Sequence, residues 1–151
     1  GMRARPQPTE NVDTVITAQE LDSALAKADA IARCVPLLES TRGLLNAARI
    51  ARIKPGAVLV DVSRGGVVDQ TALALALAEG QLRGAALDVF EVEPLPAHSP
   101  FWAMGNVIVT PHCSSVYEGW ALKSVAMFCD NLNRWKAGDQ LTNVVDPKRG
   151  Y

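Results

Sequence analysis

The feature that most constrains the fold of this chain is an alternation of short apolar runs with segments of helical pattern. Continuous apolar runs occur at 57–62 (AVLVDV), 85–90 (AALDVF) and 107–110, and a further one at 30–35 is followed by Pro36. Runs of this kind, with helices between them, are typical of parallel strands whose two faces are both covered. The sequence therefore predicts an α/β fold built on a parallel sheet.

Capping residues mark where the predicted helices begin. In a capping box, a Ser or Thr at the start of a helix exchanges hydrogen bonds with a Glu three residues later. Thr17 with Glu20, and Ser115 with Glu118, fit this spacing, and Asn or Asp caps the other two helices. The predicted helices are 18–27, 47–53 after Asn46, 70–79 after Asp69, and 116–137. The stretch 12–16 has the pattern of one additional short strand.

Composition narrows the class of protein. The chain has 151 residues, 48% apolar and 21% charged, with a net charge of −1, which is typical of one globular domain. We expect no nucleic-acid or membrane partner, because the charge is balanced and no apolar run approaches the roughly 20 residues of a membrane span. The polar first ten residues predict no signal peptide. Cys34, Cys113 and Cys129 lack a zinc or disulfide spacing, so we expect no metal and free, buried thiols in the cytoplasm.

Polar side chains follow three of the predicted strands. Arg64 comes after the first, Asp88 and Glu93 lie at the end of the second, and His112 follows the third. Because parallel strands end at one edge of a sheet, these side chains should converge there.

This set of side chains suits the reduction of a 2-keto acid. Arginine binds a carboxylate through two N–H groups, and histidine can donate a proton near neutral pH. A carboxylate beside the histidine orients its ring, and the hydride must come from a cofactor. Taken singly, Arg64, Glu93 and His112 are also compatible with structural or solvated roles, and the pattern alone leaves both interpretations open.

Three long motifs resemble the D-isomer-specific 2-hydroxyacid dehydrogenase family. They are 54–69 (KPGAVLVDVSRGGVVD), 84–94 (GAALDVFEVEP) and 106–112 (NVIVTPH). The stretch 30–44 is similar as well, and the resemblance extends over about 18–143. Three motifs in the right order are far more specific than one short motif. The resemblance implies a partial Rossmann-like, doubly wound parallel sheet that lacks the first βαβ half.

The resemblance also implies a role for each matching residue. Arg64 would bind the carboxylate and keto group of the substrate, and His112 would be the general acid in reduction and the base in oxidation. Glu93 would be the partner of His112, and Asp88 would accept hydrogen bonds from the nicotinamide carboxamide. The cofactor, NAD or NADP, would also contact residues at or near Cys34, Pro36, Thr41 and Val62.

Parts of a complete enzyme are missing from these residues. No G-x-G-x-x-G motif occurs, and Gly65-Gly66 follows the arginine instead. We divide the chain into an N-terminal remnant (1–16), the C-terminal part of the NAD(P)-binding domain with its catalytic motifs (17–138), and a tail (139–151). We expect an enzyme fragment that is inactive by itself. The alternatives are an enzyme half completed by a partner chain, and a non-catalytic binding or scaffold module of the same fold.

Two further expectations concern the surface. The predicted strand at 30–35 lacks a neighbour on one side, and the long helix carries more apolar side chains than a small sheet can cover, so we expect a homodimer. The alternative is a monomer whose N-terminal segment covers the strand edge. Arg3 and Arg5 either bind the 2′-phosphate of NADP or lie exposed near the N-terminus. The residues that would select among 2-keto acids lie outside these motifs.

Overall fold

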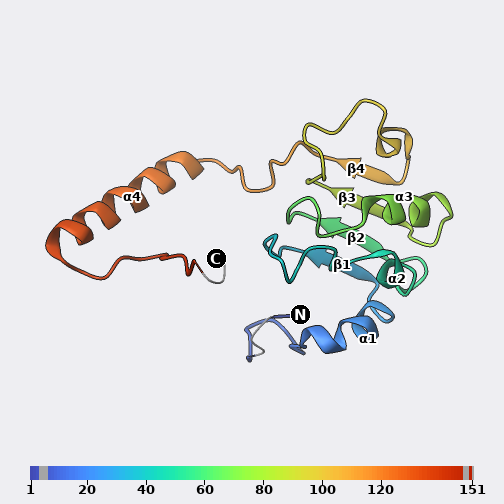
Figure 1. Cartoon of the computed structure of the whole chain (residues 1–151), viewed down its shortest axis with the longest axis horizontal. Coiled ribbons are helices and arrows are strands. Elements are labelled where there is room, and N and C mark those ends of the chain that lie inside the picture. Colours follow the sequence, from blue (N-terminus) through green and yellow to red (C-terminus); the bar gives the residue numbers. More distant parts are fainter. Residues whose placement is uncertain (4–6, 148–149, 151) are drawn as a thin grey trace. The chain divides into compact units, whose positions relative to one another are not determined.

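The structure is a computed structural model that describes residues 1–3, 7–147 and 150. The chain forms two compact units, Gly1–Pro111 and His112–Tyr151, and their elements are labelled in Figure 1. Arg5, one of the two arginines considered for a 2′-phosphate, lies outside the described residues. The other, Arg3, donates from Nη1 to the hydroxyl of Thr9 at 3.0 Å.

The first unit is built on a four-stranded sheet in which all strands are parallel and lie in chain order (Figure 1). The strands are β1 (Ala30–Arg33), β2 (Val58–Asp61), β3 (Gly84–Leu87) and β4 (Val107–Val109). Each is one or two residues shorter than predicted. The register places Arg33, Asp61, Leu87 and Val109 in one row across the sheet. The predicted Rossmann-like parallel sheet is thus confirmed.

Short helices precede the first strand of this sheet and connect the others. They are η1 (Ala18–Glu20), α1 (Leu21–Leu25), α2 (Ala47–Ile50), α3 (Gln70–Ala78) and η2 (Pro100–Ala103). The predicted caps are confirmed, because the side chains of Asn46 and Asp69 each accept a backbone N–H of the first turn at 3.0 Å. The Glu20 carboxylate accepts the N–H of Thr17 at 3.0 Å, as the first capping box requires.

The two faces of the sheet are covered unequally. Because parallel neighbours in chain order are joined by right-handed crossovers, α2 and α3 lie on the same face. That face carries the buried Leu59 and Leu87, which belong to the core. On the other face Ala30 and Ala32 are exposed, and Ile108 is 66% exposed. The expectation that the strand at 30–35 is buried on both faces is therefore wrong, because β1 is an edge strand with an open second face.

Two predicted elements differ from the structure. The stretch 12–16 is no strand, since Ile16 forms only a single bridge with Met2. The capping box at Ser115–Glu118 is also wrong, because the helix of the second unit, α4 (Trp120–Ala137), begins after Gly119. Gly119 has a φ of 80°, and a right-handed helix cannot continue backwards through that conformation. The predicted end of α4 at Gly138, whose φ is 78°, is confirmed.

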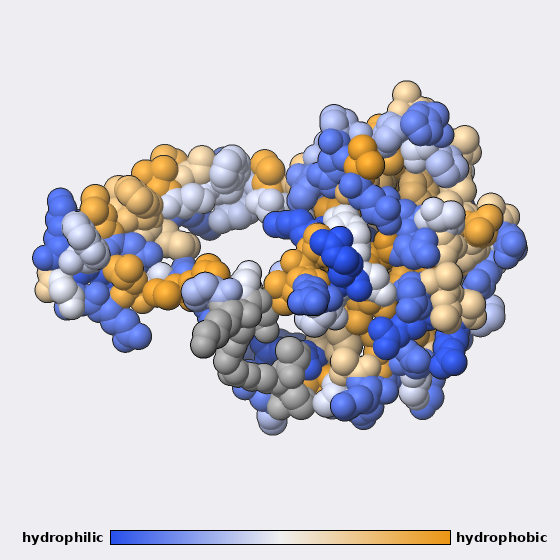
Figure 2. Space-filling model, viewed as in Figure 1, coloured by the Kyte–Doolittle hydropathy of each residue, from blue (hydrophilic) through white to orange (hydrophobic). Residues whose placement is uncertain are grey.

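The second unit exposes many apolar side chains. None of the residues of α4 is buried, and Figure 2 shows hydrophobic side chains along the helix among hydrophilic ones. The largest exposed apolar side chains of α4 are Trp120, Leu122, Val125, Met127, Phe128, Leu132 and Trp135. Cys34, Cys113 and Cys129 are exposed, so the expectation of buried thiols is wrong. Within the described residues, no helix is long and apolar enough to cross a membrane.

Candidate active site

The loop after β2 carries Arg64, the third residue beyond the strand. Arg64 is exposed, and its Nη1 donates to the carbonyl oxygen of the preceding residue, Ser63, at 2.7 Å. This bond uses one of the five N–H donors of the guanidinium. The guanidinium is thus held by one N–H against the adjacent backbone, and it presents a positive charge at the carboxyl end of the sheet.

The loop after β3 carries the two predicted carboxylates. Asp88 directly follows β3, is 3% exposed, and accepts the hydroxyl of Thr110 at 2.5 Å. Glu93 is exposed, and its Oε1 accepts the backbone N–H of Phe90 at 2.9 Å. Both carboxylates therefore lie at the same edge of the sheet as Arg64, since β2 and β3 are parallel neighbours.

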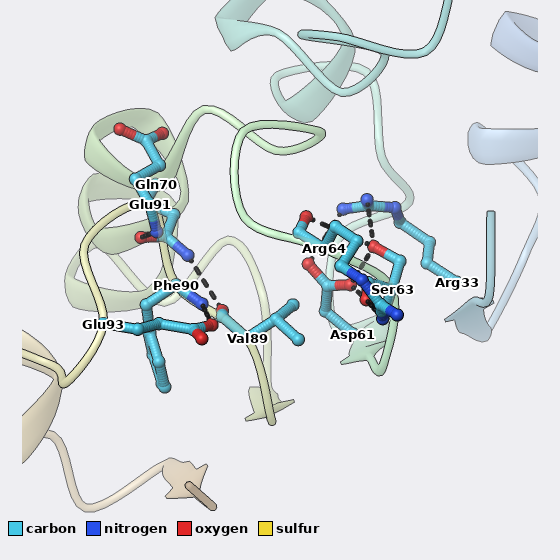
Figure 3. A network of polar contacts seen from close by, with 9 residues as sticks. All are labelled: Arg33, Asp61, Ser63, Arg64, Gln70, Val89, Phe90, Glu91 and Glu93. Atoms are coloured by element: carbon cyan, nitrogen blue, oxygen red, sulfur yellow. Dashed lines mark hydrogen bonds and ion pairs between the residues drawn. The ribbon is translucent and has the colours of Figure 1, made fainter. Parts of the chain in front are cut away.

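The loops after β2 and β3 pack directly against each other. A Cβ atom on Gly65 would lie 1.9 Å from the carbonyl oxygen of Phe90, so only glycine allows this approach. Gln70, at the start of α3, holds the second loop from both directions. Its Nε2 donates to the carbonyl of Val89 at 3.1 Å, and its Oε1 accepts the N–H of Glu91 at 3.2 Å. Figure 3 shows Gln70 beside Val89 and Glu91.

A buried polar network lies beneath Arg64 (Figure 3). Arg33, Asp61 and Ser63 are 6%, 1% and 2% exposed. Arg33 donates from Nη1 to Asp61 Oδ2 at 3.1 Å and from Nη2 to Ser63 Oγ at 2.9 Å. Burial lowers the pKa of the Arg33 guanidinium below its ordinary value, and the Asp61 carboxylate opposes that shift. The guanidinium nevertheless keeps its charge at physiological pH.

The residues predicted to line the cofactor cleft fall largely in one row. Backbone hydrogen bonds continue one residue beyond the strands, from the N–H of Val62 to Arg33 and from the N–H of Asp88 to Asp61. Cys34, Val62 and Asp88 are thus the next residues after β1, β2 and β3. Cys34 is exposed and Val62 is half-buried.

Thr41 shapes the loop after β1. Its hydroxyl donates to the carbonyl of Pro36 at 2.6 Å and accepts the N–H of Leu38 at 2.8 Å. These bonds fold the loop back on itself immediately after the end of the strand. The structure thus places Pro36 and Thr41 together near the carboxyl end of β1.

His112 begins the second unit, three residues after β4 ends. It is half-buried, and its φ of 51° is in the left-handed region. The pairing of His112 with Glu93 stays a prediction, as does the meeting of His112 with Arg64 on one rim. Among the described residues, no group of three or more His, Cys, Asp or Glu side chains could hold a metal ion.

The sequence alone did not predict that Arg33, Asp61 and Ser63 contact one another. One feature of the sequence could have indicated that Arg33 is buried. Side chains alternate between the two faces of a strand, so Arg33, two residues after Ile31, lies on the same covered face. Pairing Arg33 with Asp61 also requires the register between β1 and β2, and a single sequence does not supply it.

An open-edged parallel α/β sheet with polar groups at the carboxyl ends of its strands defines a nucleotide-binding type of domain. Residues 1–114 match the family model described as D-isomer specific 2-hydroxyacid dehydrogenase, NAD binding domain. The chain belongs to this family, which is a family of oxidoreductases.

Solved structures agree with this assignment. A D-isomer specific 2-hydroxyacid dehydrogenase from Xanthobacter autotrophicus Py2, in complex with NADPH and MES, is 42% identical with a TM-score of 0.92. The match covers 100% of this chain and 62% of that protein. An NADPH-dependent glyoxylate/hydroxypyruvate reductase from Sinorhizobium meliloti, in complex with NADP and sulfate, is 35% identical with a TM-score of 0.91. Here the match covers 100% of this chain and 48% of the relative.

A curated relative is similar over a comparable stretch. Glyoxylate/hydroxypyruvate reductase B from Citrobacter koseri is 40% identical over 129 residues, which is 85% of this chain and 40% of the relative. The chain thus spans less than half the length of this relative.

Proposed function

We propose that these residues form the catalytic part of an NAD(P)-dependent oxidoreductase that interconverts 2-keto acids and D-2-hydroxy acids. The observation that carries the proposal is the close packing of the Arg64 loop against the loop that leads to Glu93, through Gly65 and Phe90. This packing brings a cation and a carboxylate to one edge of the sheet. The names of the relatives point to a short 2-keto acid as the substrate class.

Each predicted catalytic residue has a chemical task in this reaction. Arg64 binds the substrate carboxylate through two N–H groups. His112 donates a proton to the keto oxygen during reduction and takes it back from the hydroxyl during oxidation. Glu93 holds the imidazole ring in the orientation for this transfer. The hydride for the carbonyl carbon would come from a nicotinamide cofactor, when one is bound.

The strand ends fit the nicotinamide half of the cofactor. Asp88 is buried at the end of β3 and already accepts one hydroxyl, and a carboxylate accepts several hydrogen bonds at once. Cys34 and Val62 continue the same row at the ends of β1 and β2. We propose that this row lines the nicotinamide cleft, with Pro36 and Thr41 on the loop beside it.

These 151 residues contain no glycine-rich phosphate-binding loop. In a Rossmann fold that loop and the helix N-terminus behind it bind the pyrophosphate. Without it the nicotinamide is poorly positioned, and poor positioning costs several kcal/mol of barrier. We therefore propose that the isolated chain turns over little or not at all.

We further propose that the chain forms a homodimer in the cytoplasm. The free edge of β1 and the exposed apolar side chains of α4 favour association. A groove of about 520 Å³ runs beside β1 and is lined partly by Met2, Ile16 and Leu21, so the N-terminal segment covers only part of the edge. Three exposed cysteines suit a reducing compartment.

Titration calorimetry with oxamate, an unreactive analogue of a 2-keto acid, tests the proposed function. We expect weak binding to the full chain, and at least about tenfold weaker binding to Arg64→Gln, because a charge-assisted pair contributes roughly 1.5–3 kcal/mol. The control is Arg83→Gln. Arg83 is also exposed, but it precedes β3 and lies at the opposite end of the strand. Equal affinity in wild type and Arg64→Gln, or an equal loss in both variants, would contradict the proposal.

A further inference from the structure

The buried network of Arg33, Asp61 and Ser63 has no part in the chemistry described above. Its three side chains lie where β1 and β2 end, on the face of the sheet covered by α2 and α3. A buried ion pair is expensive to desolvate and is often no more stabilising than a well-packed apolar pair. The network therefore calls for an explanation beyond the stability of the sheet.

Three hydrogen bonds of this network converge on Ser63, in addition to the direct bond between Arg33 and Asp61. The Ser63 hydroxyl accepts from Arg33 Nη2 at 2.9 Å and donates to Asp61 Oδ1 at 2.6 Å. The Ser63 backbone N–H donates to the same carboxylate oxygen at 3.0 Å. One residue is thus fixed by its side chain and its backbone, both held by groups that belong to strands.

Ser63 in turn contacts the guanidinium at the end of the Arg64 side chain. Its carbonyl oxygen accepts Arg64 Nη1 at 2.7 Å, so the direction of that carbonyl sets where the guanidinium lies. On the other side of Arg64, Gly65 is in close contact with the carbonyl of Phe90. Arg64 is therefore an exposed residue whose guanidinium is held by Ser63 and whose backbone is flanked by the constrained residues Ser63 and Gly65.

Charge supports the same interpretation. Asp61 neutralises Arg33 within 3.1 Å, so the network presents no second net charge beside Arg64. The substrate anion then meets one exposed cation, and the buried pair sets only the position of that cation.

We infer that Arg33, Asp61 and Ser63 are positioning residues for Arg64, which they hold through the Ser63 hydroxyl and carbonyl in the orientation that binds a 2-keto acid carboxylate. The inference rests on the proposed function for the identity of the ligand. The geometry of the network stands independently of it.

The test removes the hydroxyl through which the Ser63 side chain contacts both Arg33 and Asp61. Ser63→Ala deletes the hydroxyl between Arg33 and Asp61, and Ser63→Thr restores it. Asp61→Asn is a second variant, which retains an acceptor oxygen but loses the charge. The matched control is Asp22→Asn, because Asp22 pairs with Arg49 at 2.8 Å between α1 and α2, away from Arg64 in the fold.

Two measurements are made on the full chain. In proton–nitrogen correlation spectra, the Nε–H signal of Arg64 is assigned by its loss in Arg64→Gln, and its exchange with water reports how firmly the guanidinium is held. Oxamate affinity is measured by calorimetry. We expect faster exchange and about tenfold weaker binding in Ser63→Ala and Asp61→Asn, recovery in Ser63→Thr, and a change within about twofold in Asp22→Asn.

The outcomes separate this inference from the proposed function. If Ser63→Ala melts at a lower temperature but keeps both the Arg64 exchange rate and the oxamate affinity, the network is merely structural and the inference is wrong. If the wild-type chain does not bind oxamate, the proposed function fails. In that case the exchange data still decide whether the network positions Arg64, because faster exchange in Ser63→Ala supports positioning and unchanged exchange overturns it.

Discussion

At the scale of single residues, Arg33 shows how a buried charge is accommodated in a small sheet. Asp61 supplies the countercharge, and Ser63 supplies a second acceptor. Among the described residues, Arg33 Nε is the one buried side-chain nitrogen or oxygen without a hydrogen-bond partner. Because a buried N–H without a partner costs free energy, the pair is not arranged for the best stability of Arg33 itself. By contrast, the hydroxyl, the backbone N–H and the backbone C=O of Ser63 all form hydrogen bonds.

Gly65 is the residue whose size matters most for the site. An added Cβ would overlap the carbonyl of Phe90 at 1.9 Å, so Gly65→Ala must push the Arg64 loop away from the loop that leads to Glu93. We expect a loss of roughly 1–3 kcal/mol in the free energy of unfolding, typical of overpacking, together with weaker oxamate binding. Thermal or urea unfolding followed by circular dichroism measures the first, and calorimetry the second.

Gly105→Ala is the control for this substitution. A Cβ on Gly105 has no neighbour within 4 Å, so we expect a change within about 0.5 kcal/mol. If Gly65→Ala and Gly105→Ala unfold alike, the two loops do not depend on the close approach at Gly65.

The sequence predicts single site residues only where they follow a strand. The pattern predicts Arg64 in this way, because a polar residue just after an apolar run lies at the carboxyl end of the strand. Arg33 and Asp61 lie within the strands, and their contact depends on the register between two segments almost 30 residues apart. A pattern within one segment does not contain that information.

At the scale of elements, periodicity and caps predict the regular part of the fold. The four parallel strands and the caps Asn46 and Asp69 follow from local pattern. The second capping box fails because Gly119, four residues after Ser115, adopts a left-handed conformation. A capping motif predicts a helix start only when the residues after it can continue the helix, and a glycine leaves that choice open.

The exposed edge of β1 gives a prediction at this scale. The N–H and C=O groups of one strand residue point to the same side. The carbonyls of Asp29 and Arg33 accept hydrogen bonds from β2 at 3.0 and 3.2 Å, so the groups of Ala30 and Ala32 face the open edge. If this edge forms the proposed homodimer, Ala32→Pro removes a donor needed for pairing and leaves the β1–β2 ladder intact.

Light scattering at low protein concentration measures this effect. We expect the wild-type chain and Ala32→Ser at twice the chain mass of 16.1 kDa, and Ala32→Pro at 16.1 kDa. A wild-type monomer would exclude the homodimer, and a dimeric Ala32→Pro would show that the edge of β1 is not the interface.

At the scale of the whole molecule, the chain consists of a sheet unit and a helical unit that meet between Pro111 and His112. The predicted acid–base residue therefore belongs to a different unit from Arg64 and Glu93. Matches to solved relatives extend over the full chain, so both units are part of the family fold. The central claim of the proposed function is that Arg64 and His112 act on the same substrate.

The chain offers a direct test of this claim, because it has only two histidines, His98 and His112. His98 is exposed and lines a separate groove beside α3, so it serves as an internal control. The imidazole proton signals are followed by NMR while oxamate is added to the full chain. We predict that the His112 signals shift, that those of His98 do not, and that Arg64→Gln abolishes the shift. An unchanged His112, or a shift that persists in Arg64→Gln, would contradict a shared site.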